Sequence, residues 1–307
     1  SKVMDMSGIN EETFEVQGGV IVRYPNTKKP TGWLKEQAGS LIQEIMPIYT
    51  KEDYKKGILA YQDMALSTGI TNVFEPMIDK RKDYELRYEA YAELAEEGKL
   101  KITFIGAYPL EPNEDYEKAF ERAAALRKKI NYDKIRLTTL KVFVDGVVEA
   151  HTAFLREEYA DAPGDFGESL FDQDTLKKLV TRAVKEGYVV HTHAIGDAAL
   201  DYILNAYEYA EKETGVFDRR NAVTHLQVVK DEQIERMKQL HIVAVVNPYW
   251  HFKNPIYYNN LEVPFLGQER ADKEYPVASF IKRGIVTSEA SDWPVTVPAD
   301  VMTSLHI

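Results

Sequence analysis

Apolar residues recur with a helical period in the first regular stretch of the chain, which begins near Thr50. Four of them follow one another at spacings of 4, 3 and 4 residues, and they are Tyr54, Ile58, Tyr61 and Ala65. Thr50 and Asp53 have the spacing of a helix-capping box, and Gly69 is typical of a helix end. The apolar run over residues 70–74 then predicts a short strand.

The same alternation of helix and strand continues towards the end of the chain. We predict further helices over residues 84–97, 116–129, 174–186, 197–213, 231–240 and 277–283. We predict seven strands, over residues 70–74, 102–105, 137–144, 188–193, 222–225, 242–246 and 285–287. Such alternation is typical of a parallel sheet covered by helices, and for 307 residues the leading architecture is an α/β fold of the (β/α)8 TIM-barrel type. An open doubly wound sheet is the alternative, but no glycine-rich phosphate loop follows an early strand.

Residues 1–45 lack this regularity, and we interpret them as an N-terminal segment ahead of a barrel domain over residues 46–307. Residues 18–24 and 29–34 have strand character on either side of a proline-containing turn, so we expect a small hairpin there.

The longest irregular stretch inside the barrel domain covers residues 249–276 and is rich in Tyr, Asn and Pro. Long loops inside compact domains are usually functional. Tyr249 and Trp250 are therefore candidates for the wall of an aromatic pocket, and simple packing is the equally weighted alternative.

Composition narrows the classes of function. The 38 basic and 49 acidic residues give a net charge of −11, which argues against nucleic acid or an anionic membrane as partner. The absence of cysteine excludes disulfides, cysteine–zinc sites and cysteine nucleophiles, so His, Asp, Glu and Lys carry any chemistry. Neither a bilayer-spanning apolar run nor a signal peptide is visible. We expect a cytoplasmic protein with a small-molecule substrate, and we leave a homo-oligomer open.

Side chains suited to metal binding lie where successive predicted strands end. They are Lys141, His191, His193, His225 and Asp292. The C-terminal ends of the strands are where barrel enzymes build their active sites. Imidazole and carboxylate groups bind zinc and similar divalent ions, so His193 and His225, on adjacent strands, are expected to share one ion. His191 and His193 project from the same face, so either is a candidate ligand and the other lines the pocket or supports the ligand.

Each candidate also has a purely structural interpretation. A single strand histidine is more often a hydrogen-bonded core residue, although a matched pair on adjacent strands reverses that balance. A charged, unpaired lysine inside a strand would be costly, so a salt bridge from Lys141 to Asp145 or Glu149 is an alternative to a metal role. Asp197 precedes an apolar helix start, and we interpret it as the N-cap of that helix.

The segments that carry these residues resemble successive motifs of the amidohydrolase superfamily, in the branch related to N-substituted formamide deformylase. They read LKVFVDG (140–146), HTHAIGDAAL (191–200), VTHLQVVKDEQIERMKQL (223–240) and SDWPV (291–295), with GGVIVRYPNTKKPTGWLKE (18–36) and STGITNV (67–73) upstream. The resemblance covers essentially the whole chain and implies a (β/α)8 barrel with one or two divalent metal ions, zinc above all. It implies that Lys141 is a carboxylated lysine bridging two metals, that His193 and His225 are ligands, and that Asp292 binds metal and takes a proton from the attacking water.

The chain departs from the family pattern at the first strand. The family carries a metal-binding His-x-His pair there, whereas the first histidine of this chain is His151. We infer that strands two to eight are present, that the first strand is missing, and that the chain is an excised piece of a longer protein. A zinc site needs about four ligands, so we expect the site in this chain to be empty or weakly occupied, with Lys141 unmodified.

The leading hypothesis for function is a metal-dependent hydrolase that cleaves C–N bonds of amides, formamides or cyclic amides with metal-activated water. Asp292 would act as general base and return the proton to the leaving nitrogen. Four further residues are expected to bind substrate or to support the ligands, and they are His191, Asp145, Tyr249 and Trp250. One alternative is a catalytically silent fragment or binding module. The other is a metal-free barrel enzyme that uses Asp145 and Glu149 as paired carboxylates.

Overall fold

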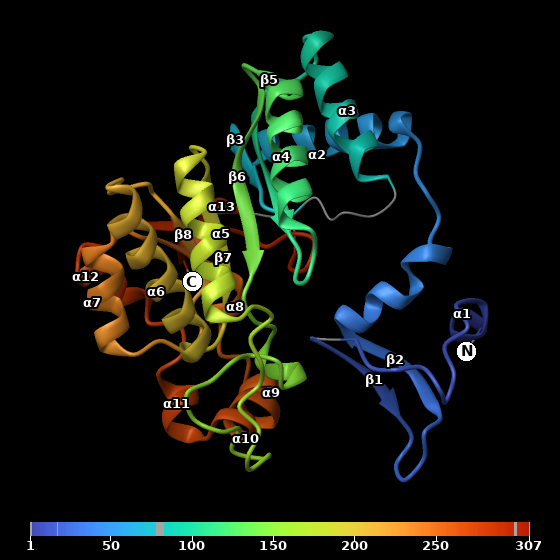
Figure 1. Cartoon of the computed structure of the whole chain (residues 1–307), viewed down its shortest axis with the longest axis vertical. Coiled ribbons are helices and arrows are strands. Elements are labelled where there is room, and N and C mark those ends of the chain that lie inside the picture. The colour runs from blue at the N-terminus through green and yellow to red at the C-terminus, as the bar shows by residue number, and fades with distance from the viewer. Residues whose placement is uncertain (1, 17, 78–82, 298–299, 307) are drawn as a thin grey trace.

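A parallel sheet wrapped by helices forms the centre of the computed structural model, which describes residues 2–16, 18–77, 83–297 and 300–306 (Figure 1). The strands are β3 (Asn72–Glu75), β4 (Thr103–Leu110), β6 (Ile135–Phe143), β7 (Val189–Ala194), β8 (Ala222–His225), β9 (Val243–Val246) and β10 (Thr287–Glu289). They lie side by side in sequence order, each parallel to its neighbour, and the short β5 (Asn131–Tyr132) pairs antiparallel with β6. The seven strands predicted from the sequence are thus all present.

Helices cover the outer face of this sheet. They are α2 (Lys51–Ser67), α3 (Tyr84–Glu96), α4 (Tyr116–Lys129), α5 (Gln173–Lys185), α6 (Asp197–Thr214), α7 (Asp231–Gln239) and α12 (Val277–Lys282). The predicted capping box of α2 is confirmed, because Thr50 accepts a hydrogen bond from the Asp53 N–H and the Asp53 carboxylate accepts one from the Thr50 N–H. Apolar side chains on the outer face of the strands, such as Phe104, Leu140 and Val190, pack with the helices in one continuous core. No described helix has the length and apolar character needed to cross a bilayer.

The interpretation of Asp197 as a helix cap was wrong. Gly196 occupies the N-cap position of α6, and no side chain caps it. The Asp197 carboxylate instead accepts a hydrogen bond from the backbone N–H of Arg156, at 2.9 Å, because the loop that carries Arg156 crosses the start of the helix.

The sheet forms a curled half-barrel in the part of the chain that the structure describes, with β3 and β10 at its two edges. Tyr61 of α2 stacks on Trp293, which follows β10, with ring centroids 5.3 Å apart, so the two edges are linked by side chains rather than by strand pairing. The inner face is accordingly accessible: Phe74 is 38% exposed and Val245 is half-buried, whereas the outward-facing Ala244 is fully buried. That a longer protein supplies a first strand stays a prediction.

The expected hairpin near the N-terminus is present. Strand β1 (Gly19–Arg23) pairs antiparallel with β2 (Pro30–Glu36), between α1 (Lys2–Met6) and the 3-10 helix η1 (Gln37–Ile45). These elements share a small apolar cluster whose buried members are Met4, Ile9, Ile21 and Ala38. The division of the chain at residue 45 into a segment and a barrel domain stays a prediction.

The expectation that residues 249–276 are irregular was wrong. They contain α8 (Pro248–His251), α9 (Pro255–Tyr257), the π-helical η3 (Tyr258–Glu262), α10 (Val263–Leu266) and α11 (Gln268–Asp272), and a last helix, α13 (Val301–His306), lies near the end of the chain. Local signals explain the short helices, because the Asn254 side chain caps α9 and a proline begins both α8 and α9. Figure 1 shows α9 to α11 and the hairpin on the side towards which the arrow of β6 points.

The loop between β6 and α5 passes very close to the start of α6. It contains the 3-10 helix η2 (Val148–Ala150), and the Phe154 carbonyl accepts a hydrogen bond from the Ala199 N–H. A Cβ atom added at Gly196 would lie 1.9 Å from that carbonyl oxygen, so only glycine fits this crossing.

We expect Gly196→Ala to lower the free energy of unfolding by roughly 1–3 kcal/mol or more, because the loop backbone must move to admit the methyl group. Gly57→Ala is the matched control, since Gly57 lies in α2 with no atom near the new methyl group. It should raise the free energy of unfolding by about 0.5–1 kcal/mol through helix propensity. Urea unfolding measures both, and equal effects of the two substitutions would contradict the close approach.

Candidate metal centre

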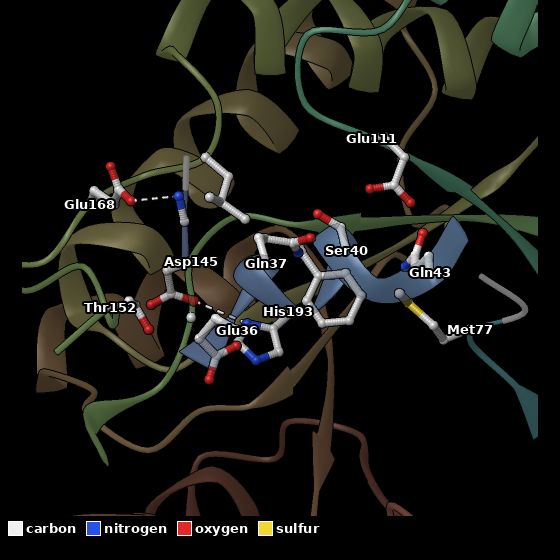
Figure 2. Close-up of a pocket in the computed structure, with 14 residues that line it drawn as sticks. Glu36, Gln37, Ser40, Gln43, Met77, Glu111, Asp145, Thr152, Glu168 and His193 are labelled. Atoms are coloured by element: carbon white, nitrogen blue, oxygen red, sulfur yellow. Dashed lines mark hydrogen bonds and ion pairs between the residues drawn. The ribbon is translucent and has the colours of Figure 1, made fainter. Parts of the chain in front are cut away.

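His193 lies on β7 with its imidazole held by a buried carboxylate. Its Nδ1 is 3.0 Å from Oδ1 of Asp145, which follows the neighbouring strand β6 (Figure 2). The bond places a proton on Nδ1 and leaves the Nε2 lone pair free, which is the tautomer that metal-binding histidines adopt when a carboxylate supports them. Burial lowers the pKa of His193 well below its usual range, so the ring is neutral.

The Asp145 carboxylate collects hydrogen bonds from three further donors. The backbone N–H groups of Ile195, Gly196 and Phe154 donate to it at 3.1, 2.8 and 3.1 Å. Burial raises the pKa of Asp145 to about 7, and the three backbone N–H groups act in the opposite direction. The side chain thereby fixes both the ring of His193 and the loop that crosses it.

His225 ends β8, where strict alternation would point its side chain at the outer helices, because Thr224 pairs in register with the inward-facing His193. The backbone of His225 is instead left-handed, with φ of 73°. The ring centroids of His225 and His193 lie 4.6 Å apart, and the two ring planes are inclined at 67°. Burial lowers the pKa of His225 well below its usual range, with smaller contributions from His193 and Lys141. The two predicted histidines therefore meet as neutral imidazoles.

Lys141 and His191 lie side by side one layer deeper in the half-barrel. The Lys141 Nζ is 3.1 Å from Nδ1 of His191, and the His191 ring contacts the inward-facing Phe74 at 5.0 Å between centroids. Burial lowers the pKa of Lys141 to about 7, while the charge of Asp292 acts to raise it. The alternative of a salt bridge from Lys141 to Asp145 or Glu149 is not found among the described residues, since Lys141 bonds to His191 and Asp145 bonds to His193.

Asp292 follows β10 with a left-handed backbone, at φ of 58°. Its Oδ2 accepts a hydrogen bond from Nε1 of Trp250 at 3.2 Å, which places Trp250 beside the predicted base. Burial raises the pKa of Asp292, and Trp250 and Lys141 act to lower it. Tyr249 lies elsewhere, with its hydroxyl bonded to the backbone of Asp300.

A cavity of about 540 Å³ opens in front of His193 and Asp145, which are the two predicted site residues among those that line it. Its remaining lining is Gly18, Glu36, Gln37, Ser40, Gln43, Met77, Glu111, Phe143, Gly146, Thr152, Glu168 and Leu170. Figure 2 shows Glu36 next to His193, and Gln37, Ser40 and Gln43 along the same side of the cavity. Burial raises the pKa of Glu36, and the nearby Asp145 raises it further.

The wall of the cavity that η1 contributes was not predicted from the sequence. The signal was present, because apolar residues at 38, 41, 42 and 45 form one helical face and leave Gln37, Ser40 and Gln43 on the other. That this polar face covers the strand ends depends on long-range packing, such as the hydrogen bond of 2.8 Å from the Gly18 N–H to Glu168.

The side chains present fit part of a divalent metal site. His193 and His225 offer neutral nitrogens at neighbouring strand ends, which is the donor chemistry that zinc prefers. Among the described residues, however, no group of three or more His, Asp or Glu side chains is placed to hold one ion. The structure thus brings together two imidazoles with suitable donor chemistry, where a stable zinc site requires about four ligands.

The imidazoles of His191, His193 and His225 make the folded state sensitive to acid. Burial lowers the pKa of each below its usual value, so the unfolded chain takes up these protons first and stability falls as the pH drops below about 6.5. Asp145, with its raised pKa, acts in the opposite sense, so variants are needed to separate the groups. We expect His225→Gln to reduce the slope of unfolding free energy against pH by about 1.4 kcal/mol per pH unit.

Urea unfolding at a series of pH values measures that slope. His241→Gln is the control, because His241 is exposed and lies outside the site. A slope that is unchanged in His225→Gln would mean that folding does not lower the pKa of His225.

The comparisons with known proteins agree with this geometry. The amidohydrolase family model Amidohydro_3 matches residues 1–304. The chain is 28% identical over 307 residues to "Putative amidohydrolase YtcJ" of Bacillus subtilis and 26% identical over 318 residues to "N-substituted formamide deformylase" of Arthrobacter pascens, covering 100% and 98% of this chain. It spans 55% of each of these relatives.

A solved structure gives the same result in three dimensions. An uncharacterized metal-dependent hydrolase from Pyrococcus furiosus superposes with a TM-score of 0.72 at 26% identity, over 99% of this chain and 58% of that one. The α/β half-barrel, the strand-end histidines and the match along nearly the whole chain lead to one conclusion: the chain belongs to the amidohydrolase family.

Proposed function

We propose that this protein is a metal-dependent hydrolase that cleaves C–N bonds of amides, formamides or cyclic amides. The observation that carries the proposal is the pairing of His193 and His225, two neutral imidazoles whose ring centroids lie 4.6 Å apart. Asp145 holds the imidazole of His193. Membership of the amidohydrolase family and the likeness to a metal-dependent hydrolase support the same reading.

The cation, zinc or a similar divalent ion, would be held by His193 and His225. When bound, such an ion supplies a Lewis acid that polarises a carbonyl and lowers the pKa of water towards about 7. Lys141 and Asp292 lie close enough that each influences the pKa of the other. With two proposed ligands among the described residues, the affinity of this chain should be low and Lys141 should carry no carboxylate.

Asp292 is the proposed general base. The Trp250 N–H holds Oδ2, which leaves Oδ1 to take a proton from the attacking water and to pass it to the leaving nitrogen. Burial raises the pKa of this carboxyl group, which brings its basicity closer to that required near neutral pH.

The metal-free alternative has less support. It requires Asp145 and Glu149 to work as an acid–base pair on a substrate. Both oxygens of Asp145 already accept bonds, Oδ1 from His193 and Oδ2 from the Gly196 backbone, so this carboxylate serves to hold its surroundings. The silent-fragment alternative is separated by the assays below.

Metal binding is the direct test, and it is independent of turnover. Titration of the purified chain with Zn²⁺ by calorimetry should show weak binding at one site. His193→Ala and His225→Ala should each weaken it by roughly tenfold or more, because one of two strong ligands is lost. His241→Ala should not weaken it, and intact-mass measurement should show unmodified Lys141. Binding that survives both site substitutions would remove the basis of the proposal.

Hydrolysis of a panel of amides, formamides and cyclic ureas in the presence of Zn²⁺ tests the role of Asp292. We expect Asp292→Asn to lower the rate by about 10²–10⁴-fold through loss of the general base. Asparagine suits the left-handed backbone at this position, so folding should be retained. Asp133→Asn, at an exposed side chain, is the control. If the unsubstituted chain binds Zn²⁺ but hydrolyses no member of the panel, the silent binding module is the better description.

A further inference from the structure

Asn247 follows β9 at a position that faces the interior of the half-barrel. Val243 and Val245 pair in register with the inward-facing Ala222 and Thr224 of β8, and Asn247 is the next residue in that alternation. Its side chain is only 2% exposed, so both of its polar atoms are cut off from solvent. It therefore lies at the carboxyl end of the strand that neighbours the one ending in His225.

The amide of Asn247 is anchored on one side only. Its Nδ2 donates a hydrogen bond of 3.1 Å to the carbonyl of Ala290, just past the end of β10. Its Oδ1 is buried and has no hydrogen-bond partner among the described residues. Rotating the amide by half a turn would bring Oδ1 against the Ala290 carbonyl, two acceptors facing each other, so the orientation is fixed. A buried acceptor without a donor costs about 1–3 kcal/mol, which makes such an atom a candidate for a role in a site.

The imidazole of His225 is the group next to this amide along the strand ends. Thr224 pairs in register with Val245, so His225 and Asn247 end adjacent strands, and the left-handed backbone of His225 turns its ring inward against His193. The Asn247 side chain acts to raise the pKa of His225, against the larger effect of burial, as an acceptor facing an imidazole N–H does.

We propose that Asn247 is a positioning residue, whose Oδ1 accepts the N–H of His225 and so presents the other imidazole nitrogen as a metal ligand. The cation-binding part of the proposal rests on the proposed function, whereas the choice of tautomer does not. Asn247 then does for His225 what Asp145 does for His193.

The two supports differ in a way that has a chemical consequence. Asp145 can carry a negative charge and strengthens the electron donation of His193, whereas a neutral amide orients His225 without adding charge. Hydrogen bonds also connect Asn247 to the edge of the sheet. The Ala290 N–H donates to the Val246 carbonyl at 2.9 Å, and the Ala290 carbonyl accepts from the Asn247 side chain.

Two nearly isosteric substitutions separate positioning from packing. Asn247→Leu keeps the volume and removes both the acceptor and the donor to Ala290, while Asn247→Asp removes that donor and keeps the acceptor. Asn205→Leu, on the outer helix α6, is the control. The first readout is the tautomer of metal-free His225, measured from long-range ¹H–¹⁵N correlations with the signal assigned by loss in His225→Gln. The second readout is the Zn²⁺ affinity from calorimetry.

We expect a single His225 tautomer in the unsubstituted protein, in Asn247→Asp and in Asn205→Leu, and a mixture in Asn247→Leu. We expect Zn²⁺ affinity to fall about 10- to 100-fold in Asn247→Leu and to be largely retained in Asn247→Asp. An Asn247→Leu protein that is folded and keeps the single tautomer overturns the proposal. If no variant binds Zn²⁺ but the tautomer responds as expected, the proposed function fails while the positioning role of Asn247 stands.

Discussion

A single buried carboxylate organises the candidate centre. Asp145 lies where the end of β6, the loop after it and the turn after β7 meet, and four N–H groups surround its two oxygens. A buried carboxylate is tolerated only when its oxygens accept hydrogen bonds. Loss of any one of the four donors would therefore raise the free-energy cost of burying the Asp145 carboxylate. The loop crossing at Phe154, the start of α6 and the ring of His193 are therefore coupled through one side chain.

Most of the architecture could be predicted from the sequence, because the local periodicity of apolar residues determines where helices and strands form. The strand over residues 222–225 and the helix over 116–129 were predicted at the bounds that the structure has. Placing His193 and His225 at neighbouring strand ends needed only the rule that parallel strands end at one edge. The family resemblance added proposed roles for the residues, but the position of His193 and His225 at neighbouring strand ends was already implied by strand order.

What could not be predicted depends on contacts between segments that are distant in sequence. Nothing near Asp197 indicates that its carboxylate is drawn to the backbone of Arg156 rather than to its own helix. Glu36 reaches the cavity because η1 packs on the hairpin, which periodicity alone does not place against the strand ends. The left-handed backbone that brings the His225 ring inward is a property of one φ angle. It departs from the inward and outward alternation of side chains that the rest of β8 follows.

His225 and Asp292 share that left-handed backbone, at φ of 73° and 58°, although neither is glycine. Side chains with a Cβ atom destabilise this conformation by roughly 1–2 kcal/mol each, and glycine does not. Substitution towards glycine at these two positions would therefore relieve that backbone strain while deleting an imidazole and a carboxylate. In a lineage relieved of selection on its chemistry, both positions should drift in that direction, so their identity in related sequences records whether the centre is still in use.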